Sequence, residues 1–277
     1  TKPYMSVGVT LQSGAGVFTN KNDTNYASKF SSDDAGKSVF YKNSDKKLYI
    51  MNAWGALASA LSGEITTTID GLFDITGTTV KLLTDFTAAD GDTTLAVTGT
   101  KVLDLNGHVI NANSKFGAIK VNSGATLTIT DSGATTATHY FNYVKDGAWT
   151  LNTTATSGTA LDAITDSTTT VAVPGGVITG GVATMGGGIY NAGTLTMTAG
   201  TITGCYAQGS GAVYGGGVYN TGTFTMSGTA TITGCYAHTT YEYNGNGHDD
   251  VTGYGGGVFI SAGTFTMAGG TITNCYC

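Results

Sequence analysis

GGGIYNAGTLTMTAGTITGCYA (Gly186–Ala207), GGGVYNTGTFTMSGTATITGCYA (Gly215–Ala237) and GGGVFISAGTFTMAGGTITNCYC (Gly255–Cys277) are three copies of one motif at the end of the chain. A motif of this length, rich in Gly and Thr and with alternating apolar residues, is typical of repeat proteins whose copies stack on one another. Such a stack determines which side chains point inward. It does not by itself indicate a reaction.

Alternation along each copy separates the inward residues from the outward ones, because successive residues of a strand face opposite sides. The apolar set is Ile189/Val218/Val258, Leu195/Phe224/Phe265, Met197/Met226/Met267 and Ile202/Ile232/Ile272. The intervening set is Thr194/Thr223/Thr264, Thr196/Thr225/Thr266, Thr201/Thr231/Thr271 and Thr203/Thr233/Thr273, which we expect to face solvent. Each copy therefore predicts three short strands separated by Gly-rich bends. Three strands per copy predict an all-β protein, a right-handed parallel β-helix with like side chains in ladders about 4.8 Å apart.

Weaker copies of the motif extend this pattern upstream. Thr170–Val173 and Val177–Gly180 match TLTM and TITG, and Ala118–Ile119 and Ala125–Thr130 match the GGV and TFTM parts. The first strands are expected at Val80–Phe86 and Lys101–His108, with Asn106-Gly107 as a turn.

Before the stack, Ala53–Leu61 has Trp54, Leu57, Ala58 and Leu61 at helical spacing, which predicts a short helix that caps the open end. We accordingly predict N-terminal strands beside the cap (1–50), the capping helix and entry (51–79), and the β-helix (80–277), with its clearest repeats at 186–277.

The charge composition excludes several classes of partner. Of the residues, 40% are hydrophobic and only 11% charged, the net charge is −6, arginine is absent and no lysine follows Lys145. Nucleic acid and anionic lipid both require clustered cations, so neither is an expected partner. No run approaches the ~20 apolar residues that span a bilayer, and no signal peptide is visible. The chain ends inside a repeat, so we interpret it as a trimmed piece of a longer protein.

The combination of motifs resembles a widespread kind of bacterial surface protein. The matching segments are Ala56–Leu61, Val80–Asp85, Leu103–Ile110, Asn122–Ser132 and the three late copies, which together extend over roughly residues 50–277. That resemblance implies a right-handed parallel β-helix of the pectin-lyase-like type that acts as an extracellular, adhesin-like stalk. The copies are also similar in style to the repeats of chlamydial polymorphic outer-membrane proteins. One departure is Cys-Tyr-Ala after TITG, where the family pattern has Asn-Thr-Ala.

Aromatic residues are the first candidates for a binding site. Two outward columns are expected, Tyr190/Tyr219/Phe259 and Tyr206/Tyr236/Tyr276. Exposed rings in a row can stack on sugar rings or hold a protein partner, although rings that only cover the outer wall of the stack explain the same pattern.

The second candidate is an insertion between the last two copies. Its polar residues are Tyr241, Glu242, Asn244, His248, Asp249 and Asp250. Oxygen ligands this close in sequence suit Ca²⁺, but the spacing is not that of an EF-hand, so we expect a recognition loop without metal.

The cysteines form a column of their own. Cys205, Cys235 and Cys275 are equivalent, with Cys277 two residues further on. Neighbouring copies would place their Cα atoms within disulfide range, so a buried thiol ladder and a disulfide are both open. No metal site is expected, because no CxxC pair or matching His occurs.

The motif positions do not favour catalysis. Positions where β-helix hydrolases and lyases carry carboxylates are Thr here, Asp162 and Asp166 are the only close acidic pair early in the stack, and the four histidines are scattered, with His108 in a turn. We therefore predict no enzyme and no cofactor. The predicted function is an adhesin-like stalk or binding module on a bacterial surface or in its secretions, which contacts a glycan or a protein. The alternative is a purely structural subunit that associates end to end in filaments; a polysaccharide-active enzyme and an ice-binding Thr array are weaker alternatives.

Overall fold

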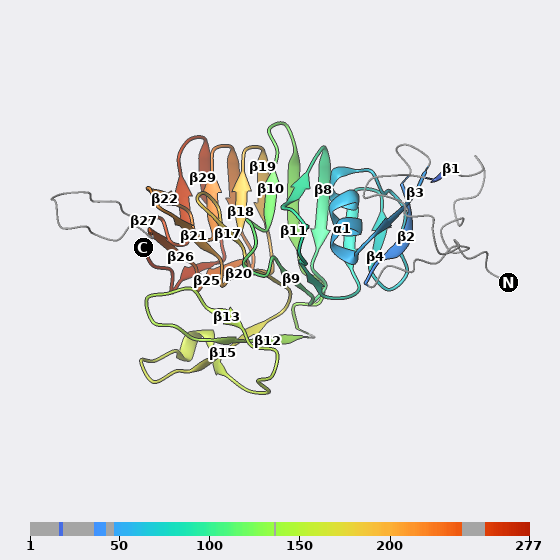
Figure 1. Ribbon diagram of the computed structural model, residues 1–277. Coiled ribbons are helices and arrows are strands. Elements are labelled where there is room, and N and C mark those ends of the chain that lie inside the picture. Colours follow the sequence, from blue (N-terminus) through green and yellow to red (C-terminus); the bar gives the residue numbers. More distant parts are fainter. Residues whose placement is uncertain (1–16, 19–35, 43–46, 136, 240–252) are drawn as a thin grey trace.

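The protein is a β-rich repeat protein in which short strands build three long sheets (Figure 1). The computed structural model describes residues 17–18, 36–42, 47–135, 137–239 and 253–277. We call the three long sheets together the stack. Every strand pair in them is parallel except the pair at the N-terminal edge of the second sheet.

Each of the three late copies supplies one strand to each sheet of the stack. The first sheet contains β7 (Leu95–Val97), β10 (Ile119–Val121), β18 (Ile189–Asn191), β23 (Val218–Asn220) and β28 (Val258–Ile260). The second contains β4 (Phe73–Thr76), β5 (Thr79–Leu82), β8 (Thr100–Asp104), β11 (Thr126–Thr130), β19 (Thr194–Met197), β24 (Thr223–Met226) and β29 (Thr264–Met267). The third contains β6 (Phe86–Thr87), β9 (Val109–Asn111), β16 (Val177–Thr179), β20 (Thr201–Thr203), β25 (Thr231–Thr233) and β30 (Thr271–Thr273).

The register of the stack confirms the equivalences read from the motif. Leu195 pairs with Phe224, and Phe224 with Phe265, while the Ile202 and Ile189 columns align in the same way. The upstream matches are also confirmed for β10 and β11, which pair with β18 and β19. The turn expected at Asn106-Gly107 has positive φ at both residues.

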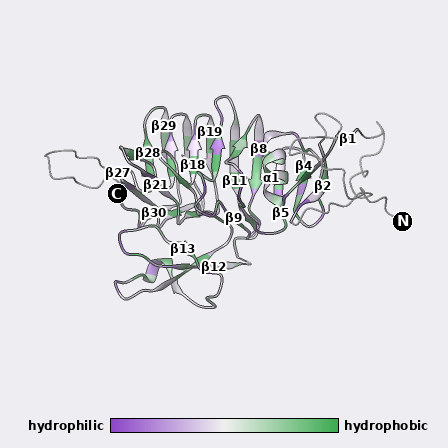
Figure 2. Cartoon of the chain, viewed as in Figure 1, coloured by the Kyte–Doolittle hydropathy of each residue, from purple (hydrophilic) through white to green (hydrophobic). Residues whose placement is uncertain are grey.

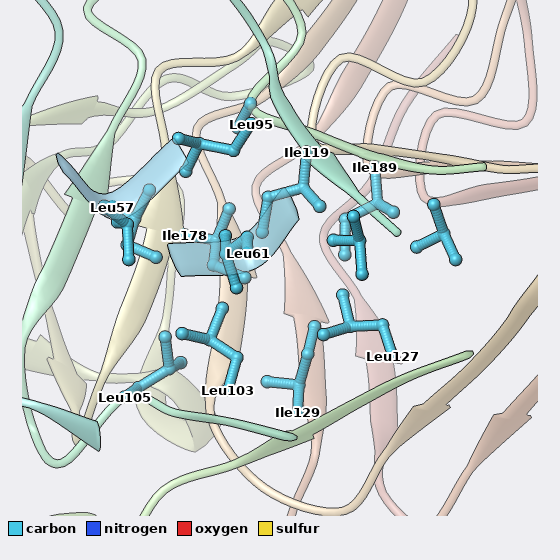
Figure 3. Close-up of a cluster of buried hydrophobic side chains, with 14 of the residues drawn as sticks. Leu57, Leu61, Leu95, Leu103, Leu105, Ile119, Leu127, Ile129, Ile178 and Ile189 are labelled. Carbon is cyan, nitrogen blue, oxygen red and sulfur yellow. The ribbon is translucent and has the colours of Figure 1, made fainter. Parts of the chain in front are cut away.

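The core lies between the three sheets, and Figure 3 shows aliphatic side chains from all of them converging there. Leu195, Phe224, Met226 and Ile232 have no exposed surface, as the alternation predicts. Burying one such side chain stabilises the fold by about 1.5–3 kcal/mol. Hydrophobic residues follow the strands of the stack and the helix in Figure 2. In the last copy the same positions are more exposed, and Met267 is 46% exposed.

The predicted helix is present as α1 (Ala53–Ser62), between the N-terminal strands and the stack (Figure 1). It begins at the N-cap Asn52, whose side-chain oxygen accepts a hydrogen bond from Gly55 N (2.7 Å), and it ends at Gly63, whose φ is 84°. Leu57 and Leu61 are fully buried in the same cluster as Leu95. The three N-terminal strands, β1 (Val17–Phe18), β2 (Ser38–Lys42) and β3 (Lys47–Met51), form a separate antiparallel sheet.

A four-stranded side sheet departs from the expected pattern. It contains β12 (Thr138–Asn142), β13 (Thr150–Leu151), β14 (Thr159–Ala160) and β15 (Thr170–Pro174), with a short 3-10 helix at Leu161–Ala163. The assignment of Thr170–Val173 to the TLTM position is therefore wrong. β19 pairs directly with β11, so that position is already filled, and β15 instead pairs antiparallel with β12. Its valines enter a second buried cluster with Phe141 and Trp149.

The remaining strands form small sheets at the edges of the late copies. They are β17 (Val182–Ala183), β21 (Tyr206–Gly209) and β26 (Tyr236–Thr239) in one, and β22 (Val213–Tyr214) and β27 (Gly253–Tyr254) in the other.

Three threonines expected in solvent are buried. Thr201 is only 4% exposed and Thr203 and Thr233 have no exposed surface, whereas Thr194 and Thr223 are exposed as predicted. For Thr203 and Thr233 the reason is the side sheet, because Trp149 lies against Gly204 and Gly234, the residues that follow them. The repeated motif alone does not predict that the side sheet covers these residues.

Candidate functional site

Five aromatic rings form a continuous row along the first sheet and the small sheet beside it. Tyr190 and Tyr219 stack with ring centroids 5.2 Å apart, and Tyr219 and Phe259 with centroids 5.8 Å apart. Tyr214 lies 4.7 Å from Phe259 and 5.3 Å from Tyr254, again between centroids. We call Tyr190, Tyr214, Tyr219, Tyr254 and Phe259 the aromatic ridge.

The exposure of the ridge is uneven. Tyr219 was expected to be an exposed ring, and that expectation is wrong, since it is only 8% exposed between Tyr190, Phe259 and Tyr214. Tyr254 is 43% exposed, and Tyr190, Tyr214 and Phe259 are half-buried. The ammonium of Lys120 lies 5.7 Å from the centroid of the Tyr190 ring. Tyr254, which stacks on Tyr214, is therefore the most exposed ring of the ridge.

Sequence reasoning missed Tyr214 and Tyr254. Each immediately precedes the GGG of its copy, where the first copy has Met185, and Met185 pairs with Tyr214. This shared tyrosine was the available signal. It lies just outside the repeated motif, which begins at the three glycines.

The second predicted column does not form a row of stacked rings. Tyr206 and Tyr236 are in register on β21 and β26, and Tyr236 also pairs with Tyr276. The Tyr236 ring stacks instead on His238, with centroids 5.3 Å apart and its hydroxyl oxygen 3.2 Å from Nδ1. Among the residues that the structure describes, no aromatic ring stacks on Tyr206.

The loop candidates are not among the described residues. Tyr241, Glu242, Asn244, His248, Asp249 and Asp250 all lie in the segment 240–252. Their proposed role in recognition stays a prediction.

The cysteine column is a ladder of free thiols. Cys205 and Cys235 are buried, Cys275 is half-buried and Cys277 exposed, and no disulfide joins them. The Sγ of Cys235 lies 3.7 Å from the carbonyl oxygen of Ile202 and 3.5 Å from that of Thr233. Burial raises the pKa of the Cys235 thiol well above its usual range, and hydrogen bonding to its neighbours Cys205 and Cys275 adds to the effect. The Cys235 thiol therefore keeps its proton at neutral pH, whereas the hydrogen bond with Cys235 lowers the pKa of the half-buried Cys275 thiol.

Two carboxylates of the stack are used to hold turns. Asp131 accepts hydrogen bonds from Gly107 N and Gly176 N, both 2.7 Å, and Asp104 accepts from Asn106 N (3.0 Å) and Ser132 N (2.8 Å). These oxygens satisfy backbone donors that would otherwise be buried without a partner. Of the predicted acidic pair Asp162 and Asp166, Asp166 forms an ion pair with Lys145 at 2.9 Å. This hydrogen bond raises the pKa of the lysine.

Two hollows lie between the side sheet and the third sheet. The smaller, of about 150 Å³, is lined by Asn111, Asn113, Trp149, Leu151, Thr179 and Tyr206, among others. The larger, of about 290 Å³, is lined by Asp85, His139, Tyr140, Leu151, Asn152 and Thr153, among others. Since Leu151 lines both, the hollows adjoin, and we call them together the side groove.

A carboxylate and two imidazoles lie at the larger hollow. Asp85 Oδ1 accepts from Val109 N (3.0 Å) and lies 3.1 Å from His108 Nδ1. His139 Nε2 lies 2.9 Å from the carbonyl oxygen of Gly107, which makes this nitrogen a donor. In the described part of the chain, no three His, Cys, Asp or Glu side chains are arranged to hold a metal ion.

No helix among the described residues has the length and apolar character needed to cross a bilayer. Comparison of the chain with protein-family models, with curated proteins and with solved structures finds no match.

Proposed function

We propose that the stack is a right-handed parallel β-helix. The support is its connectivity: each late copy adds one strand to each of three parallel sheets, in register with its neighbours. Parallel strands linked by crossovers are right-handed in nearly all proteins. Like residues then lie above one another, as the Leu195–Phe224–Phe265 column does.

On this scaffold the protein acts as an adhesin-like binding module outside a bacterial cell, and its partner at the aromatic ridge is a protein. The observation that carries this choice is the stacking inside the ridge. The faces of Tyr219 are covered by Tyr190 at 5.2 Å and Phe259 at 5.8 Å, and Tyr254 stacks on Tyr214 at 5.3 Å, so much of the ring-face area of the ridge is already occupied by other rings. Stacking on a sugar requires a free ring face, whereas protein interfaces use tyrosine as an apolar body with a polar tip.

The charge around the ridge supports the same choice. Lys120 is the cation beside Tyr190, and no lysine occurs in the late copies themselves. A partner held by phosphate contacts would need several cations here. An apolar, weakly charged protein surface fits the ridge better.

The test is binding to arrays of purified extracellular proteins and of glycans, with the wild type and a Tyr214→Ala/Tyr254→Ala double variant. Since buried aromatic contacts at interfaces are often worth about 2 kcal/mol, we expect the double variant to bind its protein partner roughly thirtyfold more weakly. Tyr236→Ala is the matched control, because this tyrosine lies in the second copy but outside the ridge, with its ring stacked on His238. Thermal unfolding confirms that each variant is folded.

The proposal is contradicted if the wild type binds no protein on the array, if the double variant binds its protein partner as tightly as the wild type, or if only glycan binding depends on the ridge. The last outcome would assign the ridge to a sugar.

A further inference from the structure

The side groove is a candidate site separate from the aromatic ridge. It lies beside the third sheet, whereas the ridge lies along the first sheet. One wall comes from the stack, with Asn111 at the end of β9 and Thr179 at the end of β16. The other wall comes from the side sheet, through Tyr140 of β12 and Leu151 of β13. Its two hollows, of about 150 and 290 Å³, together reach the size range of small-molecule sites.

The lining of the groove is polar but almost uncharged. Amides and hydroxyls are supplied by Asn111, Asn113, Ser114, Thr150, Thr179 and Thr153. Asp85 is the one carboxylate in the lining of the two hollows, and no lysine lines either of them. A ligand carrying phosphate, sulfate or carboxylate would therefore find no cation in this lining.

The groove is also lined by two tyrosines. Tyr206 lines the smaller hollow and Tyr140 the larger, and both are half-buried. Within the described residues neither ring stacks on another aromatic ring, in contrast to Tyr219. Each can therefore accept the apolar face of a sugar ring.

The smaller hollow also borders a buried tryptophan. Trp149 is part of its lining and has no exposed surface, and its Nε1 has no hydrogen-bond partner among the described residues. A ligand in this hollow would therefore lie close to the Trp149 side chain.

From these observations we infer that the side groove binds a neutral oligosaccharide, with sugar rings against Tyr206 and Tyr140 and hydroxyls bonded to Asn111, Asn113 and Asp85. Such a ligand combines apolar ring faces with many hydroxyls and carries no charge, which is the complement of this lining. The inference does not depend on the ridge.

The experiment titrates the whole chain separately with cellohexaose, xylohexaose, mannohexaose and maltohexaose, by calorimetry and by tryptophan emission. Hexagalacturonate is the acidic counterpart. The chain has two tryptophans, and Trp54 is a buried residue of α1 whose Nε1 donates a hydrogen bond to Thr93 O at 2.8 Å. A change in emission on binding therefore reports on Trp149. We expect at least one neutral hexaose to bind with such a change, and hexagalacturonate to bind at least tenfold more weakly.

Two variants and one matched control locate the site. Tyr206→Ala and Tyr140→Ala remove a ring from opposite walls and should each weaken hexaose binding about tenfold. Tyr236→Ala removes the tyrosine in register with Tyr206, one copy further along and outside the lining, and should leave binding unchanged. Thermal unfolding confirms that the three variants are folded.

The inference is overturned if no neutral hexaose binds, if hexagalacturonate binds as tightly as the neutral sugars, or if Tyr236→Ala weakens binding as much as Tyr206→Ala. The ridge variant Tyr214→Ala/Tyr254→Ala should bind the hexaose normally. Failure of the ridge proposal and failure of the groove are therefore distinguishable.

Discussion

The side-chain amide of Asn191 donates a hydrogen bond to the amide oxygen of Asn220 over 2.6 Å, in a core that is otherwise apolar. Both residues are fully buried and in register on β18 and β23. Asn191 Nδ2 also bonds Thr223 O at 2.9 Å, and Asn220 Nδ2 bonds Thr264 O at 3.1 Å. The pair thus joins the first sheet to the start of the second in two consecutive copies.

Replacing either asparagine should destabilise the fold. Asn220→Ala leaves Asn191 Nδ2 and the Thr264 carbonyl with fewer partners, and each buried group left unpaired costs about 1–3 kcal/mol. Chemical denaturation measures the loss for Asn191→Ala, Asn220→Ala and the double variant. Because both side chains belong to one network, the double variant should lose less than the two single losses combined. Strict additivity would show that the pair is not coupled.

The Asn191–Asn220 pair also shows what the sequence could and could not reveal. Both residues follow the inward Ile189 and Val218 by two, so alternation places them inward. The row of asparagines has only these two members, because the residues in register on either side of them are Val121 and Ile260. The sequence shows this limit as well. Register was predictable in the late copies because their strands repeat at fixed places in one motif.

The side sheet was not predictable in the same way. Thr170–Val173 alternates as TLTM does, and alternation specifies a face without specifying the neighbouring strand. Its true partner is β12, and what directs it there is packing of Val171 and Val173 with Phe141 and Trp149. The side groove could not be read from the sequence for the same reason, since its walls come from separate parts of the chain.

The buried Cys235 thiol predicts a pH dependence of stability, which the lowered pKa of the half-buried Cys275 opposes only in part. Burial raises the pKa of Cys235 in the folded state, so the fold keeps this proton at pH values where the unfolded chain, with an ordinary thiol pKa of about 8.5, loses it. The stabilising contribution is therefore fully present below that pH and declines as pH rises above it. The unfolding free energy of the wild type, measured by denaturant titration, should be lower at pH 9.5 than at pH 7.0.

Cys235→Ala is the control for this effect. It removes the titrating group and should flatten the decline between the two pH values, although it lowers stability at pH 7.0 through the lost packing. Equal declines in the two proteins would assign the effect to other groups. Alkylation offers a second check, because iodoacetamide should label the exposed Cys277 of the native protein and leave Cys235 unlabelled until denaturant is added.

The attachment of the side sheet should depend on Gly234. A Cβ at this position would lie 2.2 Å from Trp149 Cδ2, which is backbone-anchored through Trp149 N to Gly234 O at 3.2 Å. Gly234 also has φ of 57°, yet the equivalent residue in the last copy is Asn274 with φ of 50°, so the backbone conformation alone admits a side chain. The collision with Trp149 is therefore the decisive constraint at this position.

Gly234→Ala should lower the free energy of unfolding by about 2–5 kcal/mol, because left-handed strain of about 1–2 kcal/mol adds to overpacking of about 1–3 kcal/mol. Gly77→Ala is the matched control: its φ is 62°, and an added Cβ there meets nothing within 4 Å, so it should lose only the strain. Denaturant titration gives both losses, and tryptophan emission reports whether Trp149 has moved into a more polar environment. If the two variants lose equal stability and the emission is unchanged in both, Trp149 does not hold the side sheet against the stack through this glycine.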